Sequence, residues 1–155
     1  MEILVATLVL AVGIVGVAKL VPVAVRMNAA NREDSTELVV AQSYMNQFIQ
    51  QPLSNAAYVD PLGNNCTISG PVGAFAGNPV IPLGNKLMIN FGGAQVAGYS
   101  LTYVDPNDPV QIRYDVRWAV YTLTGTSAKR FIVGVRKLGG NAPLLPVSLD
   151  SMVGK

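Results

Sequence analysis

Residues 1–18 read Met1-Glu2-Ile3-Leu4-Val5-Ala6-Thr7-Leu8-Val9-Leu10-Ala11-Val12-Gly13-Ile14-Val15-Gly16-Val17-Ala18, a long apolar segment with one carboxylate at its head. No other charged residue precedes Lys19. The 23 residues of the stretch 3–25 would form about 35 Å of α-helix, which is long enough to cross a bilayer. An ionised carboxylate at hydrocarbon depth is costly unless it is paired, so Glu2 requires a partner.

The segment differs from a secretory signal peptide. It has no basic stretch before the apolar core, its core is too long, and no small-residue cleavage site ends it. A plain membrane anchor would share its length and composition. The carboxylate at its head argues against a plain anchor. It favours a segment whose carboxylate is paired with another group inside the apolar phase.

This N-terminal sequence resembles the first helix of bacterial type IV pilins and of the pseudopilins of type II secretion. It is most similar to the pilus-modification (minor pilin) branch, through residues 1–6, residues 8–18 and Pro22 shortly after. The resemblance implies a prepilin whose short basic leader is removed by a prepilin peptidase, whose new N-terminus is methylated, and whose helices bundle into a filament core. It also implies that Glu2 pairs with the amino terminus of a neighbouring copy, so Met1 and Glu2 are the candidate assembly residues.

The position of the glutamate departs from the family pattern. In pilins it follows the processed N-terminus by a few residues, whereas here it is the second residue. We therefore expect this sequence to lack the leader and the first residues of the mature protein. Unusual processing or a truncated chain would give the same sequence.

Composition favours a small anchored domain. Hydrophobic residues make up 50% of the 155 residues and charged residues 13%, a balance expected when a membrane-length helix is included. The net charge of +2 is too small and too scattered to predict nucleic-acid binding. The single cysteine, Cys66, cannot form an intrachain disulfide and is interpreted as a small buried or turn residue.

No pattern of catalytic residues is present. Histidine, the commonest general base and metal ligand, is absent from the sequence. There is no Gly-rich phosphate loop, no Gly-x-Ser-x-Gly motif and no carboxylate cluster of ligand spacing. We expect no enzymatic activity, no metal site and no cofactor.

The first helix is predicted to continue beyond the apolar segment. After a polar stretch at residues 28–37, the residues Leu38, Ala41, Met45 and Phe48 recur at three- and four-residue spacing, which is typical of an amphipathic helix. Pro52 should end it. We expect residues 1–27 to project as the transmembrane or filament-core half, and residues 28–155 to form a globular domain.

Small residues and a proline interrupt the apolar segment. Gly13 and Gly16 permit close approach of another helix. Between Gly13 and Pro22 the helix should also loosen most readily, because glycine lowers helix propensity and proline removes a hydrogen bond. In pilins this stretch can melt when the filament forms, and the resemblance implies the same here.

Three strands are predicted in the second half of the chain. Tyr99, Leu101 and Tyr103 alternate with polar residues, residues 110–120 alternate likewise, and a third strand starts at Lys129. Short connections predict an antiparallel meander with one core face and one solvent face, and Trp118 on the core face. In the Gly- and Pro-rich middle, residues 65–69 and 86–91 are weaker strand candidates.

The strand pair is also similar to the C-terminal strands of pilus-modification proteins. The matching residues are Tyr114, Val116, Trp118, Lys129 and Arg130. Together with the N-terminal match, this resemblance covers both ends of the chain and leaves the Gly- and Pro-rich middle unmatched.

The sequence thus predicts an α+β, pilin-like fold, with a long N-terminal helix packed on an antiparallel sheet of about four strands. The predicted function is a structural subunit of a type IV pilus-like filament at the bacterial cell surface, held in the inner membrane before assembly. Its partners would be other copies of itself, the pilus assembly machinery and the prepilin peptidase, with roles in adhesion and motility implied by the resemblance. The alternatives are a minor pilin or pseudopilin that primes a short filament, and a membrane-tethered binding module.

Overall fold

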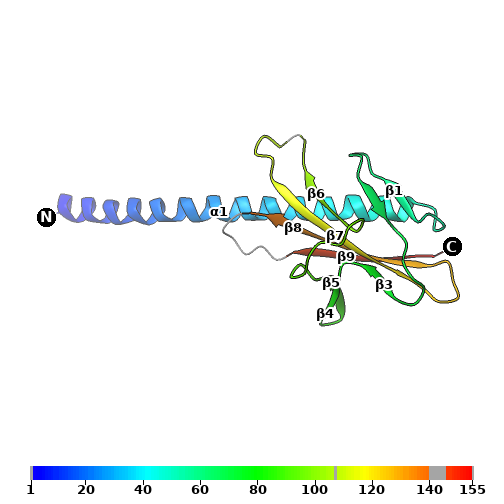
Figure 1. The fold of residues 1–155 in the computed structure, drawn as a ribbon. Helices are drawn as coiled ribbons and strands as arrows, with labels where there is room; N and C mark the ends of the chain where they lie inside the picture. The colour runs from blue at the N-terminus through cyan, green and yellow to red at the C-terminus, as the bar shows by residue number, and fades with distance from the viewer. Residues whose placement is uncertain (1, 107, 140–145, 155) are drawn as a thin grey trace. The chain divides into compact units, whose positions relative to one another are not determined.

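The computed structural model describes residues 2–106, 108–139 and 146–154, without the side chains at positions 2, 4, 29, 30 and 33. Over these residues the protein is α+β, with one helix followed by strands that pair antiparallel (Figure 1). The elements are α1 (Glu2–Gln50), β1 (Ala57–Val59), β2 (Asn65–Thr67), β3 (Phe75–Gly77), β4 (Val80–Leu83), β5 (Lys86–Ile89), β6 (Ser100–Val104), β7 (Arg113–Thr122), β8 (Lys129–Leu138) and β9 (Val147–Val153).

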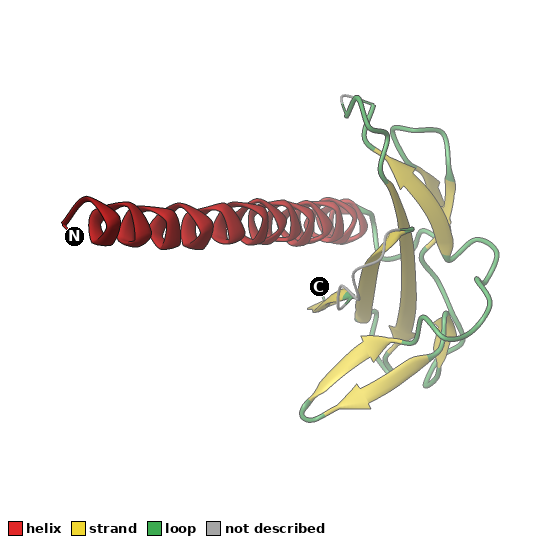
Figure 2. Ribbon diagram, turned by 90° about the vertical axis from the view of Figure 1, so that its left-hand side faces the viewer, coloured by secondary structure: helices red, strands yellow, loops and turns green. Residues whose placement is uncertain are grey.

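The chain divides into two compact units, Met1–Ser35 and Thr36–Lys155. The first consists of helical residues, and the second holds the remaining helical turns and the strands, which loops and turns connect (Figure 2). The expected division after residue 27 stays a prediction about which part of the helix functions outside the domain.

The helix ends where the sequence predicted. α1 stops at Gln50, two residues before Pro52, and the amide of Gln51 closes the last turn by donating to the Phe48 carbonyl at 3.2 Å. Proline restricts the residue before it to extended conformations, so the helix cannot continue.

The buried face of the helix in the second unit contains three of the four predicted residues, Ala41, Met45 and Phe48, and lacks Leu38. Leu38 and its neighbour Val39 are 39% and 62% exposed, so the prediction that Leu38 covers the sheet is wrong. The buried residues that were not predicted are Glu37, Val40 and Tyr44. Successive helical residues point about 100° apart, so a face that passes through Glu37 and Ala41 turns Leu38 and Val39 away from the core.

The main sheet has five strands, of which at most four lie side by side at one level. β7 pairs with β8 from Arg113↔Leu138 to Thr122↔Lys129, and β9 pairs with the other edge of β8. Along the opposite edge of β7, β6 pairs with the first half of the strand and β3 with the second half. The predicted meander is therefore present as β6–β7–β8, with β3 and β9 added.

Two further hairpins, β1–β2 and β4–β5, lie outside the main sheet. β2 and β5 correspond to the weaker strand candidates of the sequence. β1, β3, β4 and β9 were not predicted.

The first face of the main sheet carries the larger core. Val116, Trp118 and Val120 of β7 alternate inward and are fully buried with Phe131 and Val133 of β8. The Phe48 ring of α1 lies 5.2 Å from the Trp118 ring and 5.7 Å from the Phe131 ring, centroid to centroid. The Trp118 Nε1 donates to the Thr67 carbonyl at 2.8 Å, so its polar atom is satisfied inside the core. The prediction that Trp118 is a core residue is confirmed.

The second face of the sheet is also covered, and the prediction of a solvent-exposed face is wrong. Asp115, Arg117 and Ala119 of β7 are buried, and Ile89 of β5 packs with Phe91 against Ala119 and Ile132. Gly134 of β8 makes this possible, because a Cβ there would lie 2.8 Å from the Ile89 Cβ. The Gly- and Pro-rich middle of the chain supplies this cover.

Removal of residues 1–28 should leave a soluble, folded domain. Every buried side chain in the described part of the chain belongs to Glu37 or to a later residue, so the deletion removes no core contact. Size-exclusion chromatography and a cooperative thermal transition in detergent-free buffer would test this. An aggregated or unfolded fragment would contradict it.

Trp118→Ala should lower the free energy of unfolding of the domain by about 3 to 5 kcal/mol, the usual loss for truncating a large buried aromatic side chain. Denaturant unfolding followed by circular dichroism measures the change. A loss under about 1 kcal/mol would be incompatible with the packing of Trp118 against Phe48.

Candidate functional site

The apolar helix segment is the most distinctive surface of the chain. Val5–Asn28 has a mean hydropathy of 2.5 and no buried side chain, and it is long and apolar enough to cross a membrane. Every described side chain from residue 3 to residue 28 is exposed. An apolar surface of this extent is unstable in water, and it requires lipid or other protein chains around it.

The predicted assembly residues lie at the start of this helix. α1 begins at Glu2, whose side chain is not described, and Met1 lies outside the described residues. The pairing of Glu2 with an amino terminus therefore stays a prediction.

Gly13, Gly16 and Pro22 all lie inside the helix. A Cβ added at either glycine would meet no atom of the described chain within 4 Å. Glycine in a helix interior costs about 1 kcal/mol relative to alanine, and no contact within the described chain explains that cost. Pro22 has no amide proton, so the Ala18 carbonyl cannot accept the usual helical hydrogen bond from it. The role of these residues in helix loosening or close packing stays a prediction.

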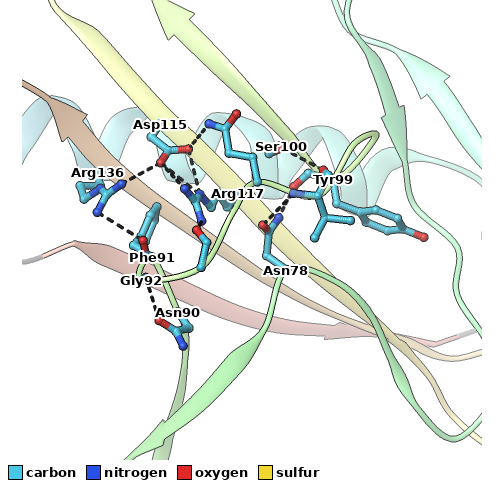
Figure 3. Close-up of polar contacts among 12 residues, drawn as sticks. Asn78, Asn90, Phe91, Gly92, Tyr99, Ser100, Asp115, Arg117 and Arg136 are labelled. Atoms are coloured by element: carbon cyan, nitrogen blue, oxygen red, sulfur yellow. Dashed lines mark hydrogen bonds and ion pairs between the residues drawn. The ribbon is translucent and has the colours of Figure 1, made fainter.

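Polar side chains gather on the second face of the main sheet (Figure 3). The Asp115 carboxylate accepts hydrogen bonds from Arg117 Nε at 3.0 and 3.1 Å, from Arg136 Nη2 at 3.1 Å and from Gln95 Nε2 at 2.8 Å. Arg117 also donates through Nη1 to the Gly93 carbonyl at 2.7 Å. One carboxylate thus holds two guanidinium groups and ties the loop after β5 to the sheet.

Phe91 lies beside both arginines of this cluster. The guanidinium carbons of Arg117 and Arg136 lie 5.2 and 4.8 Å from the centre of its ring. These distances are within the range of cation–π attraction. The aromatic ring therefore compensates part of the charge that the single carboxylate leaves on the two arginines.

Asn78 completes the polar contacts where β3 and β6 meet on the edge of β7. Its buried Nδ2 donates to the carbonyls of Tyr99 at 2.7 Å and Trp118 at 3.3 Å, and its Oδ1 accepts from the Val96 amide at 3.3 Å. Its neighbour Gly77 has a φ of 98°, which only glycine adopts readily. A Cβ at Gly77 would lie 2.6 Å from the Trp118 carbonyl oxygen, so glycine also permits the close approach of β3 to β7.

A second polar network lies on the helix side of the domain. The buried Asp60 carboxylate accepts from the Tyr44 hydroxyl at 2.9 Å, from Asn64 Nδ2 at 2.9 Å and from the amides of Leu62 and Asn64 at 2.9 and 2.7 Å. Burial alone would raise the pKa of Asp60, but these hydrogen bonds outweigh it and lower the pKa. Asp60 is therefore ionised at neutral pH and fixes the β1–β2 loop to α1.

Cys66 is fully buried, as predicted for a small core residue. Burial, together with the nearby Asp60 charge, raises the pKa of its thiol to about 11. The thiol is protonated at neutral pH and is a poor nucleophile.

Sequence reasoning missed the Asp115 cluster and the Asn78 contacts. The available signal was weak: Asp115 and Arg117 alternate onto the same face as Ala119, a small residue that is not typical of a solvent-exposed strand position. Among the described residues, no group of three or more His, Cys, Asp and Glu side chains is suited to hold a metal ion. The chemistry of the two polar networks is that of saturated hydrogen bonds, which hold loops in place.

Compared with known proteins, the chain matches no protein-family model, no curated protein and no solved structure.

Asp115→Ala should lower the free energy of unfolding by about 3 to 5 kcal/mol, because it leaves the buried Arg117 without its counter-charge. The matched control is Asp150→Ala, which breaks the half-exposed ion pair with Arg130 and should cost less than about 1 kcal/mol. Urea unfolding followed by Trp118 fluorescence measures both. Similar small losses for the two variants would show that the cluster does not hold the second face together.

Proposed function

We propose that this protein is a structural subunit of a type IV pilus-like extracellular filament and polymerises through its apolar N-terminal helix. The main support for this proposal is the contrast between the two units. Residues 3–28 bury no described side chain, whereas Thr36–Lys155 contains its own core. The domain does not need the apolar segment for its stability. The segment is accordingly a surface for other molecules.

The apolar segment would be covered in two environments. Before assembly, lipid of the inner membrane surrounds it; in a filament, the helices of other copies replace the lipid. Gly13 and Gly16 permit close approach of those helices, since nothing on the described chain occupies the space beside them. The stretch from Gly13 to Pro22 allows the helix to loosen during the transfer from membrane to filament.

Glu2 would set the register of assembly. Among packed apolar helices its carboxylate requires a cation, and the pilin resemblance implies the amino terminus of a neighbouring copy, with Met1 and Glu2 as the assembly residues. The prepilin peptidase and the pilus assembly machinery would be separate partners. In this proposal the protein has no enzymatic role, and it uses no cofactor or nucleic acid.

The exposed helix is also compatible with two other functions. A minor pilin or pseudopilin would use the same chemistry at lower copy number, and low abundance in sheared surface filaments would distinguish it. A membrane-tethered binding module would use residues 3–28 only as an anchor. The carboxylate at the head of the apolar segment favours polymerisation, because an anchor has no use for a charge at that position.

Glu2→Ala and Glu2→Gln should abolish or sharply reduce filaments while expression, membrane insertion and domain folding remain normal. An unpaired charge in an apolar assembly costs about 3 to 5 kcal/mol, which is enough to prevent polymerisation. Electron microscopy of sheared surface material, from cells with no other copy of the protein, provides the measurement.

Asp34→Ala is the matched control, because it removes an exposed carboxylate from the same helix outside the apolar segment. It should leave filaments unchanged. Abundant normal filaments from Glu2→Ala cells would overturn the pairing mechanism.

A further inference from the structure

A groove lies on the helix side of the domain, between α1, the β1–β2 loop and the end of β6. Its volume is about 290 Å³. The side chains that give it an apolar and aromatic lining are Val39, Tyr44, Leu62 and Tyr103. Two carboxylates, Asp60 and Asp105, stand at its wall, and none of the described residues that line it is basic. Asp60 is buried and accepts four hydrogen bonds within the domain, so the acidic character of this mainly apolar groove comes from Asp105.

A complementary surface lies at the tip of the β4–β5 hairpin. Leu83 is 64% exposed and pairs in register with Lys86, which is also exposed. Directly paired residues hold their Cβ atoms about 5 Å apart, so the tip presents an apolar side chain beside an ammonium group. Gly84 turns the chain with a φ of 59°, which keeps the tip narrow.

The groove and the hairpin tip of one chain lie on opposite sides of the main sheet. Tyr44 belongs to the core that α1 forms on the first face, with Val116, Trp118 and Val120. β5 packs on the second face, against Ala119 and Ile132 (Figure 1). The sheet separates them, so a hairpin tip that enters this groove must come from another molecule.

We propose that the β4–β5 hairpin tip of a second copy occupies this groove, with Leu83 on the apolar floor and Lys86 facing Asp105. The choice of occupant rests on charge complementarity between the acidic wall and the basic tip. Because the groove and the tip lie on opposite sides of the sheet, one neighbour cannot occupy both, so the contact is heterologous and can repeat from copy to copy. The inference rests on the proposed filament function and identifies the contact between its globular domains.

Crosslinking of paired cysteines tests the contact in the full chain in cells. Leu62→Cys/Leu83→Cys places one thiol at the groove and one at the hairpin tip, and a short bis-maleimide should give a ladder of oligomers. Leu62→Cys/Met152→Cys is the matched control, because Leu83 and Met152 are equally exposed at 64%. The buried Cys66 is present in both variants and should give no ladder in the unmodified chain.

Charge exchange gives a second measurement on the same background. Lys86→Asp should remove the crosslinked ladder, the dimer included, and Asp105→Lys combined with Lys86→Asp should restore it. Raised salt should weaken the ladder, because the charges at the rim are partly exposed.

Electron microscopy of the same samples distinguishes the two proposals. Filaments without a ladder, or with an equal ladder in the Met152 control, would overturn the groove contact and leave the filament function standing. A ladder without filaments would support the contact and overturn the filament function. Absence of both would overturn both proposals.

Discussion

Strand β7 is covered on both faces and paired along both edges, and the rest of the domain is positioned by it. β8 occupies one edge, while β6 and β3 share the other. Its side chains alternate between a face packed on α1 through Trp118 and a face that holds the Asp115 cluster. A shift of one residue in its register would place Arg117 in the aromatic core and Trp118 among the ion pairs. The helix side and the hairpin side are thus fixed to one another through this strand.

Local periodicity predicted the helix end, the meander and the core position of Trp118, because each depends on nearby residues. The second face of the sheet could not be predicted in this way. Asp115 and Arg117 have the charge of exposed residues, and they are buried only because Arg136, Gln95 and the Gly93 carbonyl arrive from distant parts of the sequence. Burial of Glu37 in place of Leu38 has a similar reason: the Glu37 carboxylate accepts from the Lys137 amide at 2.9 Å, a contact 100 residues away. In the candidate site, the structure places Gly13, Gly16 and Pro22 inside the helix, and their role in loosening or close packing stays a prediction.

The two parts of the helix follow different physical rules. In residues 3–28 every described side chain is exposed, and apolar side chains lie all around the helix. In the turns after Thr36, one face of the helix is buried and the other is exposed. Isolated helices owe little of their stability to propensity alone, so the apolar part gains most from the medium that surrounds it. The domain part gains from packing around Phe48. One continuous element therefore serves two environments, and neither part needs the other to satisfy its own side chains.

An apolar helix surface attracts other helices without defining how far one slides along the next, because hydrophobic attraction is non-directional. Register requires contacts that are favourable in only one alignment, such as a buried charge with its partner or an apolar side chain in a fitted groove. The proposed pairing of the carboxylate at the head of the apolar segment and the proposed groove contact would both be of this kind, and they involve different units of the chain. In an assembly they would constrain separate parts of each copy. The apolar segment would supply most of the attraction, and these two polar features would determine the geometry in which it acts.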